Sequence, residues 1–370
     1  MTDYDLVRLL LTDRRLGRSH PDPERAARFS ESVIFGRARP TSPTEAADHA
    51  RMRRLLAPWF AARRLEAMRP RVQQLVDGLL DDLAGAGRPV DFHEAVSFPL
   101  PALVICELLG VPYRDREDFR RWSDDAADMT DQARSLAGLG ELWQYLTELV
   151  AAKLDDPGED VLTGLIEAHR ADPDGLSLDE VAQLGAGLLF AGQETTVTAI
   201  DTGVVLLATH PDQRDALADD PTLVAPAVEE ILRSALPTTG RRTAATDPGQ
   251  VGDERDNGLA RWANSDIDVD GVTIPAGDLV MLGLQQANHS PCLVGQHAGF
   301  HIARDPNPHL TFGHGPHFCI GAPLARLELH VLFVALLRRF PTLSLAVPVE
   351  ELRTRNELLT GGLTALPVTW

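Results

Sequence analysis

The chain has 370 residues and a formal net charge of −19 at pH 7, because 54 acidic residues outnumber 35 basic ones. Such an excess of negative charge disfavours nucleic acid and anionic membranes as partners. Three cysteines make no disulfide framework, and neither a long apolar run nor a leader-like N-terminus is present, so we expect a cytoplasmic protein. The length suits a single domain over residues 1–370.

Helical patterns separated by Gly and Pro fill the first half of the chain. They predict four helices, over residues 72–83, 92–109, 115–129 and 140–154. Ahead of them, His49 and Arg53 are four residues apart and therefore share one helix face. Arginines crowd the same neighbourhood, at positions Arg51, Arg54, Arg63, Arg64, Arg69 and Arg71. They form either a solvated face or a docking surface for an acidic protein.

The longest predicted helix covers residues 178–209. Ser177 and Glu180 form a capping box before it, and Pro211 ends it. At 1.5 Å per residue it would extend about 48 Å, enough to cross the molecule. Its middle, residues 191–196 (Ala-Gly-Gln-Glu-Thr-Thr), is weak for a helix because it combines Gly with β-branched residues. Taken alone, this could be an ordinary flaw in a long helix.

Two features follow the long helix. Glu230 and Arg233 form an i,i+3 pair of opposite charge, a pattern that carries little information by itself. Residues 248–266 are rich in Gly, Asp and Asn and indicate an inserted surface loop. Trp262 in this segment would either anchor the loop or contact a partner.

Residues 309–328 combine a glycine-rich loop with a following helix. Three glycines permit tight turns around Cys319: Gly313, Gly315 and Gly321. Pro323 suits the first turn of a helix, and residues 324–329 are strong helix formers. Cys319 therefore lies just before a helix N-terminus, whose dipole favours a thiolate.

Several interpretations of this cysteine compete. It could be a buried structural cysteine, although these rarely lie in a loop with three glycines. It could be a nucleophile. It could join a zinc site with three nearby histidines, His309, His314 and His317. No paired CxxC or HxxxH frame supports such a site. The remaining interpretation is a thiolate that holds haem iron.

The run Phe312-Gly-x-Gly-x-His317-x-Cys319-x-Gly321, followed by Ala-Pro-Leu-Ala-Arg-Leu-Glu, resembles the haem-binding loop and next helix of cytochromes P450 in the form common in actinobacteria. The resemblance implies a mainly α fold with a minor β region. Haem b would lie between the long helix and the helix after the loop, with Cys319 as axial ligand of the iron. Residues 1–18 resemble a segment that lies a few dozen residues into such proteins, so the N-terminus is expected to be short.

The resemblance also implies which residues bind the haem. His49 and Arg53 match a His-x-x-x-Arg pattern that reaches a haem propionate. Arg242, in the run Arg-Thr-Ala-Ala-Thr-Asp, resembles a strand arginine with the same role, to which bidentate geometry suits an arginine. His317 and Gly321 belong to the loop around the iron ligand.

In the long helix, the weak segment resembles the oxygen-binding kink of the family. Ala191 and Gly192 would leave room beside the iron. Glu194 and Thr195 would form the acid–alcohol pair that relays protons to dioxygen, a task that needs a hydroxyl within reach and an acid to reload it.

Residues 287–300 depart from the family pattern. Glu230 and Arg233 resemble a structural pair that another arginine completes, and on this register Gly299 takes the place of that arginine. We expect a histidine to substitute for it, or haem retention to suffer; the candidates are His289, His297 and His301.

The resemblance implies a haem-thiolate monooxygenase that oxidises a small organic substrate with dioxygen and two electrons from a ferredoxin. A secondary-metabolite intermediate, free or presented on a carrier protein, fits the actinobacterial relatives by analogy. Hydroxylation, epoxidation and coupling remain open. One alternative is a P450-like auxiliary protein that activates a partner enzyme such as a glycosyltransferase. Another is a peroxygenase, which the intact Glu194–Thr195 pair disfavours.

Overall fold

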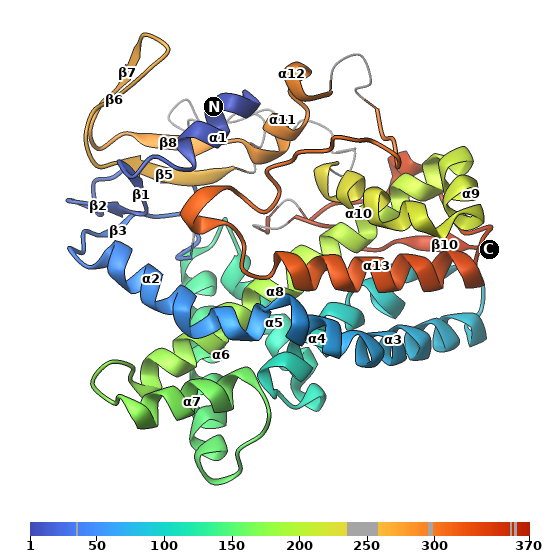
Figure 1. The fold of residues 1–370 in the computed structure, drawn as a ribbon, viewed down its shortest axis with the longest axis horizontal. Helices are drawn as coiled ribbons and strands as arrows, with labels where there is room; N and C mark the ends of the chain where they lie inside the picture. Colours follow the sequence, from blue (N-terminus) through green and yellow to red (C-terminus); the bar gives the residue numbers. More distant parts are fainter. Residues whose placement is uncertain (35, 235–257, 295–298, 356, 359–360) are drawn as a thin grey trace.

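The computed structural model describes the whole chain except residues 35, 235–257, 295–298, 356 and 359–360. It is mainly helical with small sheets, as predicted (Figure 1). The longer helices are α2 (Glu45–Leu56), α3 (Ala62–Gly85), α4 (Pro99–Leu109), α5 (Arg116–Ala127), α6 (Gln132–Asp155), α7 (Val161–Ala171), α8 (Leu178–Thr209), α9 (Pro211–Asp219), α10 (Val224–Arg233) and α13 (Ala322–Arg339). The short ones are α1 (Tyr4–Leu10), α11 (Leu284–Asn288) and α12 (Pro291–Val294). Among the helices of this described part, none is long and apolar enough to cross a membrane.

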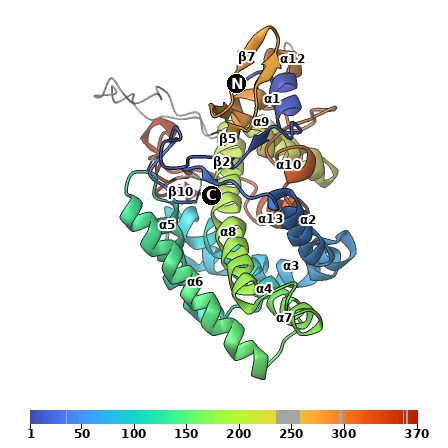
Figure 2. The same cartoon turned by 90° about the vertical axis from the view of Figure 1, so that its left-hand side faces the viewer.

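Helix α8 runs through the middle of the molecule, with α5 and α6 on one side and α2 and α3 on the other (Figure 2). The predicted capping box is confirmed: Ser177 Oγ accepts from Glu180 N at 3.1 Å, and Ser177 N donates to Glu180 Oε2 at 2.9 Å. Most side chains of α8 are buried because α4, α6, α7 and α10 pack around it. A side chain at Gly203 would collide with Phe333 of α13, so this glycine permits close packing.

Three predicted helices differ from the observed ones for local reasons. Helix α3 begins at Ala62 and runs through Pro70, whereas the predicted helix begins only at residue 72. Helix α6 begins earlier than predicted because the Asp131 side chain caps it, accepting from Ala133 N and Arg134 N. The predicted helix over 92–109 is divided: a π-helical turn, His93–Ser97, precedes α4.

The small sheets lie beside the helices (Figure 1). One has the order β1-β5-β8, with β1 (Leu16–Gly17) and β8 (Leu279–Leu282) both antiparallel to β5 (Leu259–Ala263). A second has the order β4-β10-β9 and holds the C-terminal strand; it contains β4 (Val90–Asp91), β10 (Pro367–Thr369) and β9 (Ser344–Leu345). Two further strand pairs are β2 (Ser19–His20) with β3 (Arg39–Pro40), and β6 (Ile267–Val269) with β7 (Val272–Ile274).

The prediction of a surface loop over residues 248–266 is wrong for its described part. Strand β5 is the central strand of its sheet, and Trp262 is only 1% exposed, with Nε1 donating to Ala27 O at 3.2 Å. Trp262 is therefore a core residue and not a partner contact. The polar composition on either side concealed the period of two that places Ala260 and Trp262 on the buried face. Residues 248–257 lie outside the described residues.

Candidate haem-thiolate site

The loop before α13 holds Cys319 by its backbone. Cys319 N donates to Phe312 O at 2.8 Å, and Phe318 N donates to Gly315 O at 3.1 Å. Gly313 and Gly315 adopt φ values of 72° and 71°, which favour glycine. At Gly315 a Cβ would also lie 2.7 Å from Thr12 Cγ2, so another residue here would strain the backbone and force Thr12 to shift. The predicted tight backbone is thus confirmed at Gly313 and Gly315, whereas Gly321 has an ordinary φ of −78° as the N-cap of α13.

Backbone donors surround the Cys319 sulfur. Burial raises the pKa of the thiol, although part of the residue is exposed, and the N–H groups of Gly321 and Ala322 together with Arg53 and Arg326 oppose that rise. A thiol with a raised pKa is a poor free nucleophile at neutral pH. A metal cation would deprotonate it, and the N–H groups would then stabilise the thiolate. The donor set thus fits an iron ligand better than a nucleophile.

A zinc site does not form around this cysteine. His309 Nε2 lies 3.1 Å from Glu229, which also accepts a bidentate pair from Arg326 at 2.7 and 2.8 Å. In the described ranges, no three His, Cys, Asp or Glu side chains gather in a way that could hold a metal.

Two residues of α2 reach the cysteine loop. Arg53 Nη1 donates to Phe318 O at 2.9 Å, and the rings of His49 and His317 have centroids 4.1 Å apart. Burial lowers the pKa of both histidines, that of His317 to about 4, so both rings are neutral at pH 7 and can each donate one hydrogen bond. The structure therefore brings His49, Arg53 and His317 together beside Cys319, while the predicted Arg242 lies outside the described residues.

Sequence reasoning missed two half-buried arginines in the same place. Arg18 and Arg261 are close enough to lower the pKa of His317 by their charge, and burial lowers their own pKa, that of Arg18 to about 10. The charge of Glu45 opposes this fall in the pKa of both arginines. A cluster of cations and neutral donors fits the carboxylates of haem propionates.

Arg261 carries a sequence signal that could have identified it. The run that starts at Arg261, Arg-Trp-Ala-Asn-Ser-Asp, has the same Arg-x-Ala-x-x-Asp spacing as the run that starts at Arg242, nineteen residues earlier in the chain. The second copy leads directly into β6 and β7, whereas the first does not. Arg261 is therefore the better candidate for the propionate arginine, since it lies on a strand beside His317.

Residues in the middle of α8 lie in two different environments. Ala191 and Thr195 are exposed although the helix as a whole is buried, and Thr195 Oγ1 donates to Ala191 O at 2.9 Å. A Cβ on Gly192 would lie 2.8 Å from Ile105 Cδ1, so this glycine allows α4 to pack closely. Exposure at mid-helix is consistent with a group bound against Ala191 and Thr195.

Glu194 lies on the buried side of α8 and is 1% exposed. Its Oε2 accepts from Arg355 Nη2 at 3.0 Å, and Arg355 Nη1 also donates to Asp124 on α5 at 3.2 Å. Burial raises the pKa of Glu194, and the Arg355 charge opposes that rise. Neither Arg355 nor Asp124 was predicted, because no local pattern links residues so far apart in the chain.

The expected network around Glu230 exists, but its second arginine was misplaced. Glu230 and Arg233 are buried and form two bonds of 2.8 Å. Arg304, not Gly299 or a histidine, completes the network, with Nε donating to Glu230 Oε2 at 3.0 Å. His301 contributes only its backbone N, His289 contacts Arg233 at 3.3 Å, and His297 lies outside the described residues. The register was wrong by five positions.

These features define a class: a mainly helical protein whose loop cysteine and central helix are arranged for haem-thiolate chemistry. The family model described as cytochrome P450 matches residues 138–231 and 256–360. The chain belongs to the cytochrome P450 family and is an enzyme of the monooxygenase type.

Named relatives span the whole chain. It is 43% identical to pentalenolactone synthase from Streptomyces exfoliatus, covering 100% of this chain and 89% of the relative. It is 36% identical to mycinamicin IV hydroxylase/epoxidase from Micromonospora griseorubida, with 100% and 89% covered. Among solved structures, the putative thioether synthase SgvP, involved in the tailoring step of griseoviridin, superposes with a TM-score of 0.88 at 36% identity, with 100% and 89% covered. The relatives are thus P450 enzymes of secondary metabolism.

Proposed function

We propose that this chain uses bound haem b to insert oxygen from dioxygen into a small secondary-metabolite intermediate. The observation that carries the proposal is the Cys319 loop, whose backbone N–H groups point at the sulfur next to a cluster of cations and neutral histidines. A thiolate-ligated haem would supply an iron centre at which dioxygen is reduced and the O–O bond is cleaved. The relatives' names support hydroxylation or epoxidation without choosing between them.

The residues of this chain divide the work of binding. Cys319 would hold the iron. The propionates would lie with His49, Arg53, His317 and Arg261, where charge-assisted hydrogen bonds fix the plane of the group. Gly321 contributes its backbone N–H, which points at the Cys319 sulfur.

Glu194 and Thr195 would move protons. Burial favours the neutral form of Glu194, so the side chain can store a proton inside the protein. The Thr195 hydroxyl donates to Ala191 O and can rotate away from it to pass a proton on. Proton delivery of this kind requires a positioned acid and hydroxyl.

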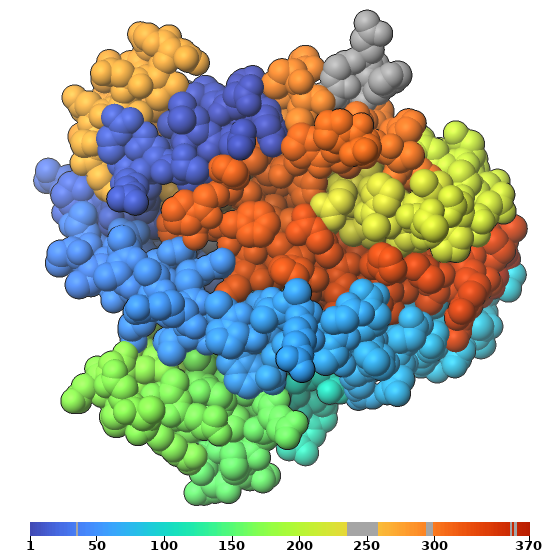
Figure 3. Space-filling model, viewed as in Figure 1, coloured from blue at the N-terminus to red at the C-terminus, as the bar shows by residue number. Residues whose placement is uncertain are grey.

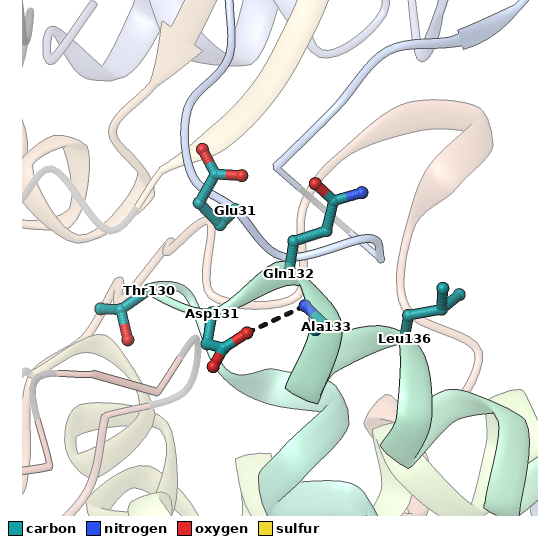
Figure 4. Close-up of a pocket in the computed structure, with 6 residues that line it drawn as sticks. All are labelled: Glu31, Thr130, Asp131, Gln132, Ala133 and Leu136. Carbon is teal, nitrogen blue, oxygen red and sulfur yellow. Dashed lines mark hydrogen bonds between the residues drawn. The ribbon is translucent and has the colours of Figure 1, made fainter.

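A cavity of about 590 Å³ lies at the connection between α5 and α6 and is a candidate substrate entrance. Glu31, from the N-terminal part of the chain, lies across from Asp131 and Gln132, and the other lining residues are Thr130, Ala133 and Leu136 (Figure 4). Asp131 is engaged in capping α6, since Oδ1 accepts from Ala133 N at 2.9 Å. Substrate would pass this mouth before reaching α8.

A ferredoxin is the electron donor that this surface suits. Figure 3 shows α2 and α3 directly against the cysteine loop and α13. Arg54 and Arg63 are exposed there, and a cavity of about 290 Å³ between α3 and α13 is lined in part by Arg69 and Arg326. Local positive charge can steer an acidic protein even though the whole chain is acidic.

Replacing the iron ligand tests the function. Cys319→Ser should abolish product formation from dioxygen with a ferredoxin and its reductase, because a serine hydroxyl is not a thiolate ligand. Lys153→Arg, at a buried ion pair with Asp160 far from the loop in the chain, serves as control and should keep activity. Full stimulation of a partner enzyme by the Cys319→Ser protein, without oxidation by the wild type, would instead show an auxiliary protein.

A further inference from the structure

Three side chains connect the acid of α8 to helix α5. Arg355 Nη2 donates to Glu194 Oε2 at 3.0 Å, while Arg355 Nη1 donates to both oxygens of Asp124 at 3.2 Å. We call these three residues the carboxyl clamp. Its arginine is only 13% exposed and bridges two carboxylates, one on α8 and one on α5. An arginine so placed fixes both partners by directional, charge-assisted bonds.

The backbone around Arg355 is held in turn. Arg355 N donates to Gly362 O at 2.9 Å, and Met129 N, just after α5, donates to Glu357 O at 2.9 Å. Gly362 has a φ of 90°, and a Cβ there would lie 3.2 Å from Thr198 Oγ1 on α8. The C-terminal segment is therefore pressed between α5 and α8, and Arg355 cannot leave Glu194 without disturbing both.

The clamp makes the two oxygens of Glu194 unequal. Oε2 accepts from Arg355, whereas Oε1 is buried and has no partner in the part of the chain that the structure describes. Arg355 Nε is likewise buried without a partner there. Buried polar atoms normally find a partner in protein or ordered water. A proton on Glu194 therefore belongs on Oε1, because Oε2 is occupied by a donor.

We propose that Arg355, held by Asp124, is a positioning residue that fixes Glu194 through Oε2 and leaves Oε1 as the oxygen that carries the proton for dioxygen reduction. The proposal rests on the proposed monooxygenase function. Each relay cycle moves one proton and no electrons. The proton leaves Oε1 toward the Thr195 hydroxyl, this hydroxyl passes its own proton on toward dioxygen, and a proton from solvent reloads Oε1.

Other charges face Glu194 and enter any pH dependence. They are Arg355 from the C-terminal segment, Asp124 and Arg120 from α5, and His93 from the π-helical turn. His93 in turn pairs with Asp201 of α8 at 2.8 Å. Removing the Arg355 charge should raise the pKa of Glu194 further, since burial then acts with less opposition.

The first measurement is the free energy of unfolding against pH, and it needs no turnover. The folded protein holds the Glu194 proton more tightly than the unfolded chain, so stability falls as pH rises from the ordinary glutamate pKa to the raised one. Glu194→Gln removes this loss. The difference in free energy of unfolding between Glu194→Gln and the protein that keeps Glu194, here called the Glu194 gap, should therefore increase with pH. When both proteins also carry Arg355→Met, the gap should increase over a longer pH range. Asp124, Arg120 and His93 are common to each pair and largely cancel.

Matched variants separate position from charge. Arg355→Lys keeps the positive charge but cannot bond Glu194 and Asp124 as the guanidinium does. In this background the Glu194 gap should change over the same pH range as in the wild type. Arg353→Met removes an exposed arginine whose side chain donates only to Glu350 O in the described residues, and should behave as the wild type. In turnover, Arg355→Met and Asp124→Asn should lower product formed per electron pair at least about tenfold, because a general acid contributes roughly 10²–10⁴-fold.

The outcomes are distinct. An Arg355→Met background that leaves the pH range of the Glu194 gap unchanged overturns the clamp. So does an unchanged yield of product per electron pair in that variant. If Arg355→Met does not fold, Asp124→Asn takes its place in both measurements. The yield of product per electron pair should again fall, but the pH range of the Glu194 gap should shorten, because the Asp124 charge raises the pKa of Glu194. An unchanged range and an unchanged yield in Asp124→Asn would overturn the clamp. A wild-type protein without a thiolate-haem spectrum overturns the proposed function and the proton role with it, while the unfolding measurement still reports on the clamp.

Discussion

Arg18 and Arg261 bring two half-buried positive charges close to His317. A buried cation is unfavourable unless an anion compensates it. The nearest acid, Glu45, already accepts from Ser19 at 2.8 Å. Two propionate carboxylates would add negative charge beside these arginines and would accept hydrogen bonds from the neutral histidines.

Arg261→Met should weaken haem retention. Loss of a hydrogen bond to a charged group costs about 1.5–3 kcal/mol, so haem should transfer to an acceptor protein such as apomyoglobin roughly 10–100 times faster. The stability of the haem-free protein should stay the same or rise, because the variant removes a buried charge.

Arg242→Met is the matched control, since Arg242 occupies the same position in the first Arg-x-Ala-x-x-Asp run. It should leave the rate of haem transfer unchanged. Faster transfer in Arg242→Met with no change in Arg261→Met would show that the sequence-based choice of Arg242 was correct and that Arg261 has a structural role only.

At the scale of elements, the Glu230 network attaches α10 to the segment before the cysteine loop. Arg304 and Asn307 both donate to Glu230, and His301 N donates to it at 2.9 Å. Burial would raise the pKa of Glu230, but these bonds and those of Arg233 lower it below its usual value. The carboxylate thus remains ionised and holds residues 301–307 in place.

Arg304→Gln should destabilise the protein by about 3 kcal/mol, because breaking a buried ion pair leaves Glu230 with fewer donors. Chemical denaturation measures the change. Gly299→Arg is the control: Gly299 is exposed with nothing within 4 Å of a Cβ, so the free energy of unfolding should change little. A stable Arg304→Gln protein would contradict the role assigned to Arg304.

Stability should also fall with acid through the same network. The folded-state pKa of Glu230 is lowered, so its contribution is present above the ordinary glutamate pKa and is lost as pH falls through the lowered value. In Arg304→Gln this loss should occur at a higher pH than in the wild type, as unfolding curves between about pH 3 and 6 would show. If both proteins lost stability at the same pH, Arg304 would not be lowering the pKa of Glu230.

The sequence predicted elements whose signals are local. The capping box at Ser177, the tight backbone at Gly313 and Gly315 and the helix around Pro323 each depend on neighbours within a few residues, and these are confirmed. What failed depends on register or on distance. Arg261 was missed because the same spacing occurs twice, and Arg355 because a contact with Glu194 across 161 positions leaves no local trace.

At the scale of the whole molecule, the candidate haem-thiolate site lies between α8 and α13. Their mutual packing, through Gly203 and Phe333, sets how far the cysteine loop lies from the middle of α8. The arginines of α2 and α3 lie on the outer face next to α13, whereas the cavity near Leu136 lies at the α5–α6 connection. Electrons and substrate would therefore enter at different places.

The central claim, that Cys319 binds haem iron as a thiolate, is tested most directly by the absorption spectrum of the purified protein after reduction and exposure to carbon monoxide. We predict a strongly red-shifted Soret band, which Cys319→Ser should lose. A folded wild-type protein that binds haem without that band, or that binds no haem, would contradict the account.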